Sequence, residues 1–254
     1  MDDVRPSERA TMSDVPEPSG SSSGLPLLEA RGLTVNASWG HIFGPVDFTV
    51  AEGGVTVFAG PESRGRAALL LTVAGRMRPS RGELTAFGRT NDAQHLFNRA
   101  AVAWIDEVDG IQQAIRIRDV VTELKRWSSP WWKWVTPAGE DDLERVCRPV
   151  FGSYPLPDLE AFVEELPELS SALFRIAVGN HRRPPLLVIG GVDRLTRREN
   201  QVLLMERLVD LGRTQTVITA DVNAVAPAGG VRAVIPVDNL TEGQFLGLDH
   251  EDRT

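Results

Sequence analysis

Residues 60–67 (GPESRGRA) have the residue types and spacing of a loop that can hold phosphate groups. The pattern G-x-x-x-x-G-K-[ST] surrounds phosphates with backbone N–H groups, pairs them with a lysine and binds Mg²⁺ through a hydroxyl. Both glycines are present, but Arg66 stands at the lysine position and Ala67 at the hydroxyl position. The sequence therefore predicts the frame of a phosphate-binding loop that lacks its metal-binding hydroxyl.

Two elements must position this loop. Residues 55–59 (VTVFA) are a continuous apolar run typical of a buried strand, and residues 67–74 (AALLLTVA) are predicted to be helical. A helix N-terminus offers free N–H groups and a positive dipole end, so it favours anions. Two interpretations stay open: the loop binds a nucleotide, or it is a strand-to-helix turn without a ligand.

Arg66 and Glu62 bear on this choice in opposite ways. The Arg66 guanidinium keeps the positive charge of the missing lysine and can donate two parallel hydrogen bonds to phosphate oxygens. It is also larger than lysine, which matters at a tight site. Glu62 adds a negative charge beside the place where phosphates would lie.

The composition limits the class of protein. The chain has 254 residues, enough for one large domain, and 42% of them are hydrophobic and 24% charged, as in soluble globular proteins. The net charge of −8 argues against a nucleic-acid partner held by phosphate contacts. Cys147 is the only cysteine, which fits a reducing cytoplasm, and no apolar run reaches the roughly 18 residues that span a bilayer.

Further strands and helices are predicted along the chain. Strands are expected at residues 27–35, 46–50 (an antiparallel edge strand), 82–88, 101–105, 184–189 and 216–219, and helices at 117–127, 141–151, 169–179 and 200–211. Residues 1–26 are rich in Ser, Pro and Gly and are predicted to be disordered, and both Met1 and Met12 are plausible starts. Residues 231–254 are predicted to form short strands and an acidic tail.

Residues 69–83 (LLLTVAGRMRPSRGE) resemble the continuation LL-xx-xAG-xxxPxxG of the ATP-binding subunits of ATP-binding cassette (ABC) transporters. Residues 28–35 and 44–50 resemble the opening antiparallel strands of that family, and the resemblance runs from about residue 27 to 222. It implies an α/β fold of the P-loop NTPase-like ABC ATPase class. That fold has a mixed central sheet, antiparallel N-terminal edge strands and a helical insert, here about residues 112–180 of a domain spanning 27–230.

Aligned with this family, the chain differs from it mainly at the positions of the family's catalytic residues. The Walker B aspartate and glutamate fall at Gly190 and Gly191, the switch histidine at Ala220 and the Q-loop glutamine at Glu107. The LSGGQ signature falls at residues 166–170 (LPELS), where Glu168 would face the nucleotide of a second subunit with a negative charge. No catalytic residue is therefore assigned, and no usual protein ligand for Mg²⁺ remains.

Several residues have two possible roles. Trp39 could stack on adenine, as an aromatic residue in the family often does, or close the sheet edge half-buried. Asp106 and Glu107 could supply a replacement metal carboxylate or form a solvated loop pair, and Asp193 is predicted to cap a turn. The candidate nucleotide-binding residues are Trp39, Gly60, Pro61, Glu62, Ser63, Arg64, Gly65, Arg66, Ala67 and Ala68.

Four tryptophans lie within eight residues of the predicted insert: Trp127, Trp131, Trp132 and Trp134. Exposed tryptophan is typical of protein interfaces, and in the family this region receives the transmembrane partner. The alternative is a small satellite core within the insert.

The resemblance implies an ATP-binding subunit that works with a transmembrane permease-like protein on the cytoplasmic face of the membrane, with impaired or absent hydrolysis. It also implies a homodimer, or a heterodimer with another such subunit. The alternative function is a pseudo-ATPase scaffold or regulatory module that does not turn over nucleotide. A third hypothesis is an active hydrolase that uses Arg66 and acidic substitutes such as Glu107.

Overall fold

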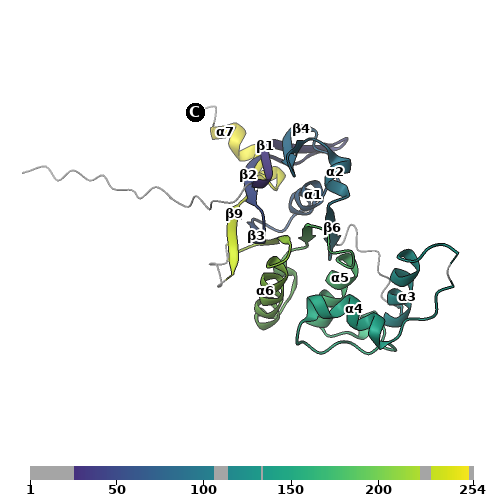
Figure 1. Ribbon diagram of the computed structural model, residues 1–254. Helices are drawn as coiled ribbons and strands as arrows, with labels where there is room; N and C mark the ends of the chain where they lie inside the picture. The colour runs from purple at the N-terminus through teal and green to yellow at the C-terminus, as the bar shows by residue number, and fades with distance from the viewer. Residues whose placement is uncertain (1–25, 106–113, 133, 224–229, 252–254) are drawn as a thin grey trace, which may run out of the picture.

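The computed structural model describes residues 26–105, 114–132, 134–223 and 230–251 (Figure 1). Two predictions fall on residues outside these ranges: disorder over residues 1–25, and the roles considered for Asp106 and Glu107. Pro26, which was included in the first of them, begins the first strand.

An antiparallel sheet opens the chain. Its strand order is β2-β1-β4-β5, and β1 pairs antiparallel with both β2 and β4. In β2, Val46, Phe48 and Val50 are buried while the residues between them are exposed, so the strand covers the core with one face. The predicted edge strand is confirmed. The bounds are β1 (Pro26–Ala37), β2 (Gly40–Ala51), β4 (Arg81–Ala86) and β5 (Arg89–Thr90).

A parallel sheet of five strands follows, in the order β6-β7-β8-β3-β9. All four residues of β7 and all six of β8 are buried, because helices or the antiparallel sheet cover both faces of these strands. Their continuous apolar sequences reflect this position. The bounds are β3 (Gly54–Ala59), β6 (Ala100–Ala103), β7 (Leu186–Ile189), β8 (Thr216–Asp221) and β9 (Val231–Pro236).

The helices lie on both sides of this sheet (Figure 1). The predicted helices of the insert and of residues 200–211 are confirmed, with ends that differ by at most two residues. The bounds are α1 (Arg64–Val73), α2 (Ala93–Phe97), α3 (Ile117–Trp127), α4 (Glu140–Phe151), α5 (Glu168–Gly179), α6 (Arg198–Gly212) and α7 (Glu242–Glu251), with 3₁₀ turns η1 (Val163–Glu165) and η2 (Val192–Arg194).

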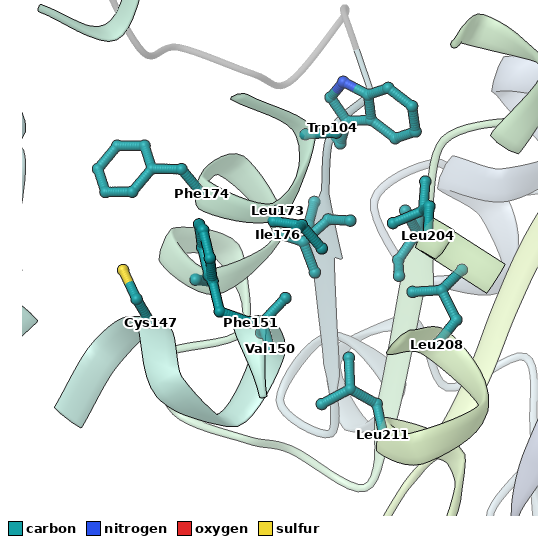
Figure 2. Packing of buried hydrophobic residues seen from close by; sticks show 14 of the residues in the cluster. Trp104, Cys147, Val150, Phe151, Leu173, Phe174, Ile176, Leu204, Leu208 and Leu211 are labelled. Carbon is teal, nitrogen blue, oxygen red and sulfur yellow. The ribbon is translucent and has the colours of Figure 1, made fainter. Parts of the chain in front are cut away.

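Two hydrophobic clusters occupy the two faces of the parallel sheet. Alternate residues of β7 divide between them: Leu187 and Ile189 belong to the cluster that contains α4, α5 and α6, whereas Leu186 and Val188 belong to the cluster that contains α1 and the antiparallel sheet. Figure 2 shows side chains of α4, α5 and α6 converging in the first cluster. The end of β7 is therefore fixed from both faces.

The carboxy-terminal prediction of short strands is only partly right. The described part of this region, residues 231–251, contains one strand, β9, and then the helix α7. The Gln244 side chain accepts hydrogen bonds from the backbone N–H groups of Leu240 and Thr241, and the Thr241 hydroxyl accepts one from the N–H of Gln244. This reciprocal cap starts the helix, and the spacing Thr241-x-x-Gln244 is a sequence signal that strand prediction overlooked.

Candidate functional site

The predicted loop connects β3 to α1, as the sequence indicated. Ser63 is the N-cap of α1: its hydroxyl oxygen accepts a hydrogen bond from the Arg66 N–H at 3.1 Å and donates one to the carbonyl oxygen of Leu240 at 2.9 Å. The loop is thus joined to the segment between β9 and α7 as well as to its own helix.

The two loop glycines are required by close packing. A Cβ atom on Gly60 would lie 2.7 Å from Leu240 Cδ1 and 2.9 Å from the carbonyl oxygen of Val237. One on Gly65 would overlap the Leu240 carbonyl and lie 2.7 Å from that of Ile42. Any larger residue at either position would displace the carboxy-terminal segment.

Arg66 is a buried arginine with a carboxylate partner. Its Nη1 donates to Asp193 Oδ2 at 2.6 Å and its Nη2 to Asp193 Oδ1 at 3.1 Å, and the two side chains are only 5% and 12% exposed. Nη1 also lies 3.3 Å from the carbonyl oxygen of Gly60, and Glu62 is a weaker neighbour at 4.0 Å. Asp193 Oδ2 additionally accepts a hydrogen bond from the Val222 N–H at 3.0 Å, so the pair links the loop to residues that follow β7 and β8.

Gly190 and Gly191 directly follow β7, and both are closely surrounded. A Cβ on Gly191 would overlap the Asp193 carboxylate and lie 2.9 Å from Arg66 Nη2. One on Gly190 would overlap the carbonyl of Trp104 and lie 3.1 Å from Arg194 Nη1. The Gly190 carbonyl accepts a hydrogen bond from the Thr219 hydroxyl. The glycines therefore make room for two arginines and their partners, and carboxylate side chains here would require those contacts to change.

A cavity of about 210 Å³ adjoins the loop. Small-molecule sites usually measure about 300–1,000 Å³, so this one matches part of a nucleotide better than a whole one. A larger cavity of about 590 Å³ lies beside β4 and α2 and does not include the loop. The residues that line the smaller cavity are Glu62, Ser63, Arg64, Arg66, Ala67, Leu70, Ile105, Gly190, Gly191 and Arg194.

Ala220 is fully buried in β8 and faces the cluster that contains α1. The next residue, Asp221, is also buried, and this burial raises the pKa of its carboxyl group, an effect that the hydrogen bond from the Asn223 N–H opposes. The backbone oxygen of Asp221 accepts a hydrogen bond from the Gly60 N–H at 3.0 Å. The end of β8 is therefore part of the loop's support.

Glu168 begins α5, and its carboxylate is bound within the chain. It accepts hydrogen bonds from the N–H and hydroxyl of Thr196 at 2.6 and 2.7 Å, and from Asn200 Nδ2 at 2.7 Å. These bonds lower the pKa of Glu168 to about 2. The carboxylate therefore joins α5 to the start of α6.

The five tryptophans with a predicted binding role are exposed, whereas Trp104 is buried in the core. Trp39 is 66% exposed, which contradicts the half-buried alternative, and the Arg64 guanidinium lies 6.0 Å from its ring centre. The satellite-core alternative for the insert is wrong, since the four exposed fractions there are 73% for Trp127, 91% for Trp131, 72% for Trp132 and 92% for Trp134. The rings of Trp131 and Trp132 make an edge-to-face contact with centres 5.8 Å apart.

Sequence analysis assigned Asp193 only to the capping of a turn and missed its pairing with Arg66. Its spacing from Arg66 follows no motif, and the contact arises only where the end of β7 meets the start of α1. Among the described residues, no group of three or more His, Cys, Asp and Glu side chains is arranged to hold a metal ion. In the same part of the chain, no helix is both long and apolar enough to cross a membrane.

No family model matches the chain. It is 29% identical over 97 residues to the cytochrome c biogenesis ATP-binding export protein CcmA of Pseudomonas putida, a match that covers 38% of this chain and 46% of that protein. With the CcmA protein of Rhodospirillum rubrum it shares 27% identity over 133 residues, 52% of this chain and 51% of the relative. The chain thus spans about half the length of the curated relatives it matches.

Solved structures resemble the chain over more of its length. The structure of cbiO1 from Clostridium perfringens, part of the ABC transporter complex cbiONQ, has a TM-score of 0.60 at 18% identity and covers 90% of this chain and 94% of its own. The ATP-binding cassette MJ0796, a dimer bound to ADP and Pi, has a TM-score of 0.62 at 14% identity, with coverage of 84% and 99%. The chain therefore has the ABC ATPase fold and is a relative of the ATP-binding subunits of ABC transporters.

Proposed function

We propose that the chain acts as the ATP-binding-type subunit of an ABC system, together with a membrane partner, and that its own site does not hydrolyse ATP. The observation that carries this proposal is the buried pair between Arg66 and Asp193. The cation of the loop already has a carboxylate partner, and Gly191 provides the space that this partner needs.

Hydrolysis of ATP requires a bound metal ion at the phosphates and a group that orients the attacking water. Ala67 has no hydroxyl for the metal, and Gly190 and Gly191 have no carboxylate for the metal or the water. Removal of one positioned catalytic group typically costs about 10²–10³ in rate. Such losses are not additive, but together they leave the site without a mechanism for cleavage.

The second candidate function is a pseudo-ATPase scaffold or regulatory module. A specific observation favours it: the loop is held by Leu240, Ser63 and the Arg66–Asp193 pair, so its shape does not depend on a nucleotide. Binding of ATP separates the two candidates, since a scaffold needs none. Hydrolysis with Glu107 as a substitute carboxylate, the third hypothesis, rests on a residue outside the described ranges.

The partner we propose is a transmembrane permease-like protein, which would hold the chain on the cytoplasmic face of the membrane. A second subunit of the ABC type, identical or different, would complete the pair. The surface that we assign to the membrane component is formed by Trp127, Trp131, Trp132 and Trp134, because exposed tryptophans are characteristic anchors of protein interfaces.

ATP turnover and binding test this function directly. The purified chain should show no turnover above background, with or without Mg²⁺. In calorimetric titrations, any affinity for ATP or ADP should change little when Mg²⁺ is added, because Ala67 offers no hydroxyl. A Mg²⁺-dependent rate that Arg66→Ala abolishes, and that the control Arg213→Ala at the exposed end of α6 retains, would overturn the proposal.

A further inference from the structure

We infer that Asp193 is an internal competitor for phosphate, and that this one carboxylate determines whether the loop accepts an anionic ligand. The inference rests on the proposed function only in assigning the loop to the phosphate groups of a nucleotide. It names a specificity-determining residue that lies outside the loop itself.

The geometry of the pair is the first argument. A guanidinium binds a carboxylate and a phosphate in the same way, with two parallel N–H groups directed at two oxygens. Asp193 uses this arrangement fully, since Nη1 and Nη2 of Arg66 contact its two different oxygens at 2.6 and 3.1 Å. A phosphate oxygen could use the same N–H groups only after Asp193 released them.

The position of the pair is the second argument. Arg66, Gly191 and Ser63 line the cavity beside the loop, so the guanidinium already borders the space that a ligand would enter. Asp193 receives a further hydrogen bond from the Val222 N–H, which keeps its carboxylate in place. The pair therefore connects the loop with the ends of β7 and β8 without any ligand.

The surrounding charges are the third argument. Glu62 lies 4.0 Å from the Arg66 guanidinium, and Asp221 is near enough to interact electrostatically with both Arg66 and Asp193. Arg198 also acts on Asp221. Arg66 therefore has carboxylates close by and little attraction left for another anion while it is paired with Asp193, and the other cations that line the cavity are Arg64 and Arg194.

The test replaces the Asp193 carboxylate by an amide of the same shape, Asp193→Asn, and measures binding of inorganic pyrophosphate and Mg²⁺-free ATP by calorimetry. The wild-type chain should bind both weakly. The variant should bind both about ten- to hundredfold more tightly, the range that one charge-assisted hydrogen bond provides. The gain should disappear in Arg66→Ala/Asp193→Asn, because the cation that receives the phosphate is then gone.

Two further variants keep the test decisive. Asp210→Asn removes the same charge on α6, where Asp210 pairs with Arg207 and Arg213, and should leave pyrophosphate affinity unchanged. If Asp193→Asn does not fold, Asp193→Ser removes the same carboxylate with a smaller polar side chain and should also increase the affinity.

Equal affinity of the wild-type and folded Asp193→Asn chains would overturn the inference, as would an equal gain in Asp210→Asn. A wild-type chain that hydrolyses ATP would refute the proposed function and leave this comparison of affinities intact. Turnover of ATP therefore tests the proposed function, and the comparison of affinities tests the role of Asp193.

Discussion

The loop and the insert both depart from the usual burial of side chains, but in opposite ways. At the loop, an arginine and an aspartate are buried, although charged side chains are rarely buried unless paired. In the insert, four tryptophans are exposed, although large aromatic side chains are usually covered. The buried charges have their partners within the chain, whereas the exposed tryptophans contact solvent.

The loop and the insert therefore differ in whether their unusual side chains have partners within the chain. Arg66 and Asp193 satisfy each other, so the loop is complete without a ligand. The tryptophan surface, in contrast, is left open by the described residues around it. A loop held by its own partners, together with an open surface on the insert, fits the structural or coupling role proposed above.

Removing the Asp193 carboxylate should give the largest loss of stability. Breaking a buried pair leaves one charge without a partner, which typically costs about 3–5 kcal/mol. We therefore expect Asp193→Ala to lower the free energy of unfolding by an amount in that range, measured by urea denaturation at neutral pH. The exposed-pair control Glu144→Ala, which removes the partner of Arg148, should change it by less than about 1 kcal/mol. Similar small effects in both variants would show that the loop does not depend on its internal pair.

Truncating the tryptophan surface should separate binding from stability. Trp131→Ala with Trp132→Ala should leave the unfolding free energy of the isolated chain close to that of wild type, since surface substitutions usually cost less than about 0.5 kcal/mol each. Binding to the membrane component should weaken by at least about 2 kcal/mol for each tryptophan that is an interface anchor. Co-purification and a melting curve measure the two effects. Val202→Ala, on the exposed side of α6, serves as the control.

A methyl group at Gly191 should disturb the loop without removing a charge. Gly191→Ala brings a Cβ against the Asp193 carboxylate and Arg66 Nη2, and overpacking of this kind typically costs about 1–3 kcal/mol. Gly243→Ala in α7 is the matched control, because no atom lies within 4 Å of its added Cβ. Urea denaturation of both variants measures the difference. Tolerance of Gly191→Ala would mean that the glycine is not needed to accommodate the pair.

The smallest expected effect concerns Glu168 and the stability of the fold at acidic pH. The pKa of Glu168 falls to about 2 in the folded chain because Thr196 and Asn200 donate hydrogen bonds to its carboxylate. A lowered pKa means that the ionised group stabilises the fold above its unfolded pKa of about 4.3, and that this contribution is lost as pH falls toward 2. Glu168→Gln should therefore reduce the pH dependence of the melting temperature between about pH 4.3 and 2. An unchanged acid limb would show that these hydrogen bonds contribute no measurable stability.

Much of the fold could be predicted because apolar periodicity reports burial directly. Residues 184–189 were recognised as a central parallel strand, and β7 and its neighbours are indeed buried on both faces. The strand, loop and helix around residues 55–74 were found for the same reason. The helix α7 was not predicted, because its apolar stretches are short and its clearest signal is the cap formed by Thr241 and Gln244.

The site was less predictable than the fold. Arg66 and Asp193 are separated by 127 positions, and no local pattern indicates that they meet. Gly190 and Gly191 were recognised as losses of carboxylates, but their role as space for neighbouring side chains depends on atoms from other elements. For the tryptophans, composition alone allowed both a small core and an exposed surface, and only the packing of α3 and α4 decided between them.

The position of β3 in its sheet determines the order in which the protein can be assembled. Within the described residues, β3 forms ladders only with β8 and β9, and the Ser63 hydroxyl bonds to Leu240, which is 177 positions further along the chain. During synthesis both edges of β3 therefore remain unpaired until β8 and β9, in the last fifth of the chain, have been made. Such distant pairing slows folding and leaves strand edges open to aggregation. The loop is translated early but acquires its final shape among the last parts of the molecule.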